Sequence, residues 1–310
     1  MIIQYFLGLL VSLSILIWSC DYAIKNSIAI SKIFKIREMF IGIFIIAIGT
    51  SLPEFAATFQ ALKLNSEGIV AGNLVGSNIA NILLVGGIMV FPIAHLNLGN
   101  EDKSTFRFFL IFSFLFFVLI IFNLSIDFKL GLILIFLLVL FFYFELKKPS
   151  NEEVFENNIK DQSTYILIFK IVIAFIALFF SSRYFIDYAK NLTEVFGVAE
   201  TTIGVTIVAF GTSLPEVVAT IISIIKKQSN LAIGNILGSN IANILGITLI
   251  AIFVNGEINY YSLLTSIDKW LFLLTSILFF IIIYLRLAGK LISIGLILSY
   301  VTYFSYQYIQ

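Results

Sequence analysis

Apolar residues run along the chain in long blocks that are separated by short polar stretches. A helix that crosses a membrane needs roughly 20 mostly apolar residues, and ten blocks approach that length. The blocks cover residues 4–22, 39–63, 69–92, 106–123, 130–146, 165–186, 201–225, 231–254, 269–285 and 288–307. The pattern therefore predicts an all-α integral membrane protein with ten transmembrane helices.

The longest polar stretch covers residues 147–164 and has no hydrophobic period of its own. We interpret it as a linker. It separates residues 1–146 from residues 165–310, and each of these parts contains five of the predicted helices.

Composition supports a membrane environment. The 310 residues are 60% hydrophobic and 12% charged, whereas soluble domains have roughly 45–50% apolar and about 25% charged residues. The net charge of +1 offers no basic surface for nucleic acid. One His and one Cys exclude a disulfide framework and a site built only from His and Cys. The expected surroundings are therefore the lipid bilayer, without a nucleic-acid partner.

Two motifs occur twice at one constant offset. Residues 41–58 read IGIFIIAIGTSLPEFAAT and residues 203–220 read IGVTIVAFGTSLPEVVAT, which is twelve identities in eighteen positions at an offset of 162. Residues 72–83, GNLVGSNIANIL, and 234–245, GNILGSNIANIL, share ten of twelve positions at the same offset. A common offset for separate motifs indicates duplication of the whole five-helix unit.

An odd number of helices in each copy turns the second copy upside down. Inverted repeats of this kind are typical of secondary transporters, with the substrate site near the midplane where the repeats meet. If the N-terminus is outside, thirteen Lys and Arg residues fall in cytoplasmic loops and five in external loops. Because positive residues favour the cytoplasmic side, we predict that both termini are outside and that the linker is cytoplasmic.

The first motif spans Gly49–Glu54 and Gly211–Glu216, each inside an apolar block. Its proline has no N–H and collides with the carbonyl four residues earlier, so the helix is expected to break there. Broken backbone in a bilayer is tolerated where it lines a cavity, and its carbonyls suit a hard cation. The motif adds hydroxyl oxygens from Thr50, Ser51, Thr212 and Ser213.

Glu54 and Glu216 are costly in such a position, because a charge at the bilayer centre costs at least about 2.5–3.5 kcal/mol. The four predicted helices that carry the motifs contain no Lys or Arg apart from Lys63, the last residue of its block. A cation between the two carboxylates would remove both the burial cost and their mutual repulsion. The sequence therefore predicts that they meet and share an ion.

The second motif adds further oxygen atoms and contains no His or Cys. Asn73 and Asn235 are open to two interpretations, a hydrogen bond between helices or a role at the site. Oxygen ligands suit Ca2+ or Mg2+, whereas Zn2+ and Cu2+ favour His or Cys. In each copy a serine and an asparagine stand four residues apart and so share one helix face: Ser77 with Asn81, and Ser239 with Asn243.

The duplicated GTSLPE and GSNIAN motifs resemble the Ca2+:cation antiporter family, specifically its Na+/Ca2+ exchanger branch of the prokaryotic type without regulatory domains. The resemblance covers nearly the whole chain. It implies Ca2+ exchange for Na+ by alternating access, with the first and sixth helices sliding over a rigid core. It also implies the ligands: Glu54, Glu216, Thr50, Thr212, Ser51, Ser213, Ser77 and Ser239, with the carbonyls of Ala47 and Ala209 at Na+ sites.

One position departs from that pattern. Some exchangers carry Asp where this chain has Asn243, and the equivalent residue Asn81 is neutral as well. The predicted centre then has two formal carboxylates, which leaves the stoichiometry and the coupling ion open. A H+- or K+-coupled Ca2+ antiporter is the alternative among transporters, and an uncoupled cation channel is the alternative from another class.

A membrane enzyme fits the sequence less well, because no His or Lys base stands near Ser51 or Ser213. We therefore predict a transporter that is not an enzyme and uses no cofactor. Its expected partners are Ca2+, Na+ and bilayer lipids. It is expected to function as a monomer in the cell membrane, without a protein partner.

Overall fold

The computed structural model describes residues 2–92, 102–148, 163–195 and 209–309, which are almost entirely helical. Seven described helices are long and apolar enough to cross a membrane, or eight if Glu38–Thr50 and Leu52–Lys63 form one bent span. The chain is therefore a helical membrane protein. The seven are Ile2–Phe34, Glu67–Val90, Lys103–Ile121, Phe128–Leu146, Thr164–Leu192, Ser229–Asn255 and Ser266–Tyr284.

These eight segments match eight of the ten predicted spans. The other two correspond to the shorter helix α12 (Leu214–Ile225) and to α16 (Lys290–Ile309), neither of which is in that set. Residues 196–208, which include the start of the predicted seventh span, lie outside the described residues, as do linker residues 149–162. The count of ten thus stays a prediction.

The first helix is longer than predicted. α1 (Ile2–Phe34) continues past residue 22 through a polar stretch. Within it, Asn26 donates to the Tyr22 carbonyl at 2.6 Å and Ser31 donates to the Ile28 carbonyl at 2.8 Å. Because these side chains bond to carbonyls of their own helix, the polar stretch does not end it.

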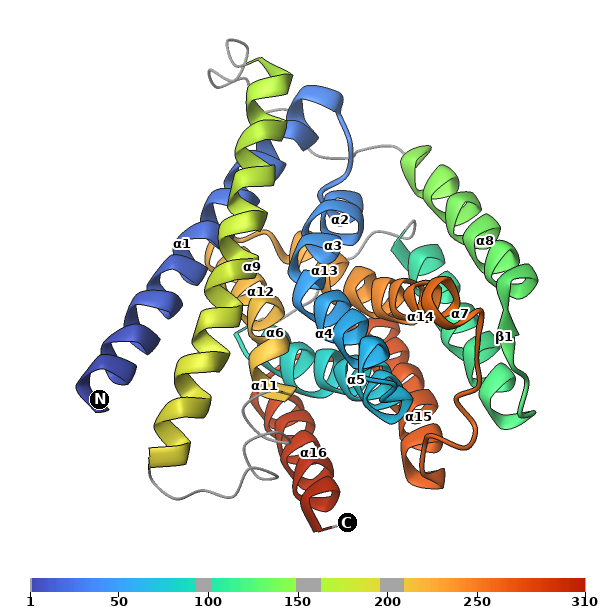
Figure 1. The fold of residues 1–310 in the computed structure, drawn as a ribbon. Helices are drawn as coiled ribbons and strands as arrows, with labels where there is room; N and C mark the ends of the chain where they lie inside the picture. The colour runs from blue at the N-terminus through green and yellow to red at the C-terminus, as the bar shows by residue number, and fades with distance from the viewer. Residues whose placement is uncertain (1, 93–101, 149–162, 196–208, 310) are drawn as a thin grey trace. The chain divides into compact units, whose positions relative to one another are not determined.

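The chain forms two compact units, and each is described by itself. The first unit comprises residues 1–53, 149–235 and 301–310. In it α1 and α9 (Thr164–Val195) lie side by side (Figure 1), and α1 also contacts α12. Its buried core includes Leu16, Ile24, Ile46, Leu178 and Val218. Its elements are α1, α2 (Glu38–Ile41), η1 (Gly42–Ile46), α3 (Ala47–Thr50), α9 (Thr164–Val195), α11 (Ala209–Thr212) and α12, with the start of α4 (Leu52–Lys63), the first half of α13 (Ser229–Ala242) and the end of α16.

Two glycines bring the backbones of η1 and α13 into contact within this unit. A Cβ on Gly42 would lie 2.5 Å from the Leu231 carbonyl oxygen, and one on Gly234 would lie 2.3 Å from the Met39 carbonyl oxygen. Any larger residue would force the two backbones apart. The pair therefore sets how closely the first-motif helix packs on the second-motif helix.

The second unit comprises residues 54–148 and 236–300. Buried aromatic rings form much of its core, with Phe116 contacting Tyr260 and Phe272 at centroid distances of 5.4 and 5.8 Å. Its elements are the rest of α4 and α13, α5 (Glu67–Ala80), η2 (Asn81–Val85), α6 (Gly86–Val90), α7 (Asp102–Ile121), β1 (Ile126–Asp127), α8 (Phe128–Leu146), η4 (Asn243–Ile247), α14 (Thr248–Asn255), β2 (Glu257–Ile258), α15 (Ser266–Tyr284) and most of α16.

Two features of the second unit were not predicted from the sequence. β1 and β2 form an antiparallel pair in which Ile126 faces Ile258. Glu145, at the end of α8, is buried, accepts a hydrogen bond from Thr105 at 2.9 Å and forms an ion pair with Lys148. Glu145 is thus a buried carboxylate outside the motifs that is neutralised by its own partner.

Candidate functional site

Both copies of the first motif interrupt a helix at the same point. Ser51 follows α3 with φ −82° and ψ 4°, and Ser213 precedes α12 with φ −83° and ψ 0°. Each helix resumes at the next residue, one position before Pro53 or Pro215. The predicted break is confirmed in both copies, since proline cannot supply the N–H that would continue the ladder.

The break frees a carbonyl that a neighbouring helix then uses. Pro215 cannot donate to Gly211, four residues earlier. Instead, Ser182 of α9 donates to the Gly211 carbonyl with 3.3 Å between Oγ and O. Nothing in the sequence marks Ser182 as functional, because it stands in an apolar block with no motif around it.

Glu216 is fully buried in the first turn of α12, where the partial positive charge of the helix N-terminus favours an anion. Ser51 donates to this carboxylate, with 3.2 Å between Oγ and Oε1. The bond joins residues 165 positions apart. The first unit thus brings a hydroxyl of one motif copy to the carboxylate of the other.

Glu54 occupies the same place in the other copy, fully buried in the first turn of α4. Its main-chain oxygen accepts a hydrogen bond from Asn73 Nδ2 at 2.9 Å, and the same nitrogen reaches Thr58 Oγ1 at 2.9 Å. A hydrogen bond between helices is thus confirmed for Asn73. Glu54 and Glu216 belong to different units, so their meeting stays a prediction.

Asn235 repeats this arrangement in the first unit. Its Nδ2 donates to the main-chain oxygen of Glu216 and to Thr220 Oγ1, both at 3.4 Å. Its Oδ1 accepts from Thr50 Oγ1 at 3.3 Å. One amide therefore touches both first-motif copies.

The second motif departs from regular helix at the same position in both copies. Asn81 begins the π-helix η2 and Asn243 begins the π-helix η4, a local widening that is frequent at functional sites. Both side chains are buried, and their amide atoms have no hydrogen-bond partner in the part of the chain that the structure describes. A buried polar group without a partner costs about 1–3 kcal/mol, so both amides are suited to receive a ligand.

The remaining predicted ligands are also located in or beside these elements. The Ala47 carbonyl accepts from the Ser51 N–H at 3.0 Å and from Thr50 Oγ1 at 3.2 Å. Ala209 begins α11. Ser77 donates to Asn73 Oδ1 at 3.3 Å. The others are buried, namely Thr212, Ser213 and Ser239.

The described residues contain no group of three or more His, Cys, Asp and Glu side chains that could hold a metal ion. A cation bound by these motifs would therefore rely on few carboxylates and many neutral oxygens. Hydroxyl, amide and carbonyl oxygens are acceptable ligands for hard cations. Such a site suits an ion that binds and leaves again.

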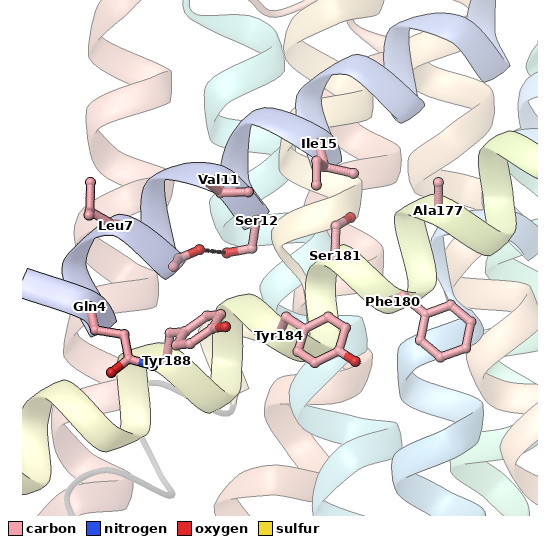
Figure 2. Close-up of a pocket in the computed structure, with 11 residues that line it drawn as sticks. Gln4, Leu7, Val11, Ser12, Ile15, Ala177, Phe180, Ser181, Tyr184 and Tyr188 are labelled. Atoms are coloured by element: carbon pink, nitrogen blue, oxygen red, sulfur yellow. Dashed lines mark hydrogen bonds between the residues drawn. The ribbon is translucent and has the colours of Figure 1, made fainter. Parts of the chain in front are cut away.

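A groove of about 460 Å³ lies between α1 and α9, and Figure 2 shows its lining side chains. Leu7, Val11 and Ile15 face it from α1, and Phe180 and Tyr184 face it from α9. No residue that lines it is charged or belongs to either motif. The groove therefore offers no carboxylate to balance the charge of a cation, although Ser12 and Ser181 contribute hydroxyl groups to its lining.

Comparison with known proteins adds independent findings. The family model described as sodium/calcium exchanger protein matches residues 4–147 and 166–309. An uncharacterized membrane protein of Methanocaldococcus jannaschii is 31% identical over 241 residues, which cover 76% of this chain and 78% of that protein. The sodium/calcium exchanger MaX1 of Methanosarcina acetivorans is 29% identical over 291 residues, which cover 79% of this chain and 81% of that protein.

A solved structure has the same fold. It is the sodium-calcium exchanger NCX_Mj soaked with 2.5 mM Na+ and 10 mM Sr2+, and it superposes with a TM-score of 0.83 and 26% identity. The match covers 97% of this chain and 98% of that one. The similarity therefore extends over the whole helical fold and is not confined to the motifs.

Proposed function

Since the chain belongs to the sodium/calcium exchanger protein family, we propose that it exchanges Ca2+ for Na+ across the membrane by alternating access. The chain is a multi-pass membrane protein, and its family consists of cation/Ca2+ exchangers rather than enzymes. Coupling to Na+ and the alternating mechanism are the parts that need a test. No cofactor enters the proposal.

The hydrogen bond between Ser51 and the buried Glu216 carboxylate carries the proposal. It links a hydroxyl and a carboxylate from opposite motif copies, and neither motif contains a His or Cys. We assign Glu54 the equivalent role. The other proposed ligands are the side-chain oxygens of Thr50, Thr212, Ser213, Ser77, Ser239, Asn81 and Asn243 and the carbonyls of Ala47 and Ala209.

Two carboxylates are neutralised by one Ca2+ or by two Na+. Competition between one divalent and several monovalent ions for one set of oxygens is the physical basis of exchange, because each ion must leave before the other binds. Asn81 and Asn243 keep the proposed charge at two negative groups. A third carboxylate would favour an additional monovalent ion.

The proposed topology follows from the duplication. Ten helices form two inverted five-helix repeats, residues 1–146 and 165–310, joined by the cytoplasmic linker 147–164. The chain spans the cell membrane, and both of its termini lie on the outer side. The exchanger is proposed to work as a monomer.

Purified protein in liposomes tests the coupling. Initial uptake of radioactive Ca2+ is measured under an imposed Na+, K+ or H+ gradient, each clamped at zero membrane potential. We expect uphill Ca2+ uptake with the outward Na+ gradient only. If uptake is driven only by a K+ or H+ gradient, that ion is the coupling ion instead of Na+. If Ca2+ merely flows down its own gradient, the protein is a channel.

A further inference from the structure

Asn73 and Asn235 occupy the same position in the two second-motif copies, 162 residues apart. Each lies four residues before a predicted serine ligand. Asn235 is fully buried, and both use their whole amide group in hydrogen bonds. The two nitrogen contacts thus recur in places that the duplication relates, while the amide oxygen accepts from a different hydroxyl in each copy.

The nitrogen of each amide holds the backbone of the helix that carries the carboxylate. Asn73 Nδ2 lies 2.9 Å from the Glu54 main-chain oxygen, and Asn235 Nδ2 lies 3.4 Å from the Glu216 main-chain oxygen. The second N–H of each amide reaches a threonine hydroxyl one turn further along the same helix. Two contacts one turn apart fix the position of the carboxylate-bearing turn along the helix axis and its rotation about that axis.

The oxygen of each amide accepts the proton of a predicted ligand hydroxyl. Ser77 Oγ donates to Asn73 Oδ1 at 3.3 Å. The single proton of Thr50 Oγ1 is shared between Asn235 Oδ1 at 3.3 Å and the Ala47 carbonyl at 3.2 Å. A hydroxyl has one proton and two lone pairs. When its proton is held on one side by these acceptors, its lone pairs are turned toward the other side, and this orients the hydroxyl oxygen as a ligand.

We propose that Asn73 and Asn235 are positioning residues for the transported cation, each fixing one carboxylate-bearing turn and orienting one hydroxyl ligand. This inference rests on the proposed function. Neither residue needs to touch the ion, because its effect passes through Glu54 and Ser77 in one unit and through Glu216 and Thr50 in the other.

The residue type fits this role closely. The arrangement needs two donors and one acceptor in one planar group, which an amide supplies. Aspartate has almost the same shape, yet it offers no donor to the glutamate carbonyl and adds a negative charge. Alanine removes all three contacts.

The test compares Asn73→Ala and Asn235→Ala with the unmodified protein by equilibrium binding of radioactive Ca2+ in detergent and by Na+-driven uptake in liposomes. Loss of groups that orient metal ligands typically weakens metal affinity about 10–100-fold. We expect Ca2+ affinity to fall about tenfold or more in each variant and KM to rise in parallel. The maximal uptake rate and the thermal unfolding midpoint should change much less.

Two further variants separate positioning from simple structural support. Thr220→Val removes one acceptor of Asn235 and keeps the contacts to Glu216 and Thr50, so its affinity loss should be smaller than that of Asn235→Ala. Asn26→Ala is the matched control, because Asn26 is a buried amide whose nitrogen bonds to its own helix. It should leave Ca2+ affinity unchanged.

The outcomes distinguish this inference from the proposed function. Unchanged Ca2+ affinity in both Asn73→Ala and Asn235→Ala, or a loss of thermal stability with no loss of affinity, would overturn the positioning role. Ca2+ binding by the unmodified protein without Na+-driven uptake would refute the coupling, while the affinities would still test the two asparagines. An unmodified protein that binds no Ca2+ would overturn both.

Discussion

Ser51 and Glu216 are joined by a hydrogen bond of 3.2 Å although they belong to different copies of the same motif. Both side chains are buried. Ser51 sits at the break in its helix, where it has left the helical backbone conformation. The break therefore does more than free carbonyls, because it places the hydroxyl against the acidic side chain of the other copy.

Ser51→Ala removes the donor that faces the Glu216 carboxylate. A hydrogen bond to a charged group contributes about 1.5–3 kcal/mol, so we expect the apparent affinity for Ca2+ to fall about tenfold to a hundredfold. Initial uptake rates over a range of Ca2+ concentrations measure this change.

Ser223→Ala serves as the control for this variant. Ser223 is a buried hydroxyl on α12 that donates to the carbonyl of Ala219 in its own helix at 2.7 Å. Its removal should leave the Ca2+ dependence of uptake as it is. A Ser51→Ala variant with the same Ca2+ dependence as Ser223→Ala would remove Ser51 from the site.

Glu54→Gln and Glu216→Gln keep the size of the side chain and remove one negative charge each. Removing one partner of a buried charge interaction costs about 3–5 kcal/mol, so we expect Na+-driven Ca2+ uptake to fall at least about a hundredfold in either variant. Glu145→Gln is the comparison, since this buried carboxylate is paired with Lys148 outside the motifs and should retain uptake. Substantial exchange by both motif variants would refute the assignment of the two carboxylates.

The duplication explains which parts of the site could be predicted. Glu54, Glu216 and their neighbouring hydroxyls appear twice at one offset, and both helix breaks follow directly from a proline. The partnership of Ser51 with Glu216 could not be read from the sequence, because it depends on how helices far apart in the chain pack together. Identity between the two copies predicts which residues are ligands, but it does not predict which of their side chains pair.

Features that occur in only one copy could not be predicted from the duplication. Ser182 corresponds by the offset of 162 to Cys20, and Glu145 corresponds to Gln307, so neither repeats. β1 and β2 have two residues each, which is too short for an alternating pattern to be detected. The extension of α1 to Phe34 was missed because its polar residues bond to carbonyls of their own helix.

Asn243→Asp adds a third carboxylate at the start of η4. Protons and monovalent cations would compete for this group, so we expect Na+-driven Ca2+ uptake to become more dependent on pH and the charge moved in each cycle to change. Uptake over a pH series and membrane current in planar bilayers measure the two effects. Asn26→Asp adds a carboxylate outside both motifs and should alter neither, whereas equal pH profiles for Asn243→Asp and the unmodified protein would contradict the prediction.

Gly72 and Gly234 occupy the same motif position but have different surroundings. A Cβ on Gly234 would lie 2.3 Å from the Met39 carbonyl oxygen, whereas one on Gly72 would meet no described atom within 4 Å. Gly234→Ala must separate two backbones, and overpacking of this kind typically costs about 1–3 kcal/mol. We expect a lower thermal unfolding midpoint in detergent, followed by tryptophan fluorescence.

Gly72→Ala should not lower the thermal unfolding midpoint. Alanine in an open helical position is favoured over glycine by about 0.5–1 kcal/mol, so the midpoint should stay the same or rise. Gly42→Ala, on the opposite side of the contact with Gly234, should reproduce the loss. If Gly234→Ala and Gly72→Ala unfold at the same temperature, the close approach of η1 and α13 does not contribute to stability, and the packing between the two motifs within the first unit must be looser than this contact indicates.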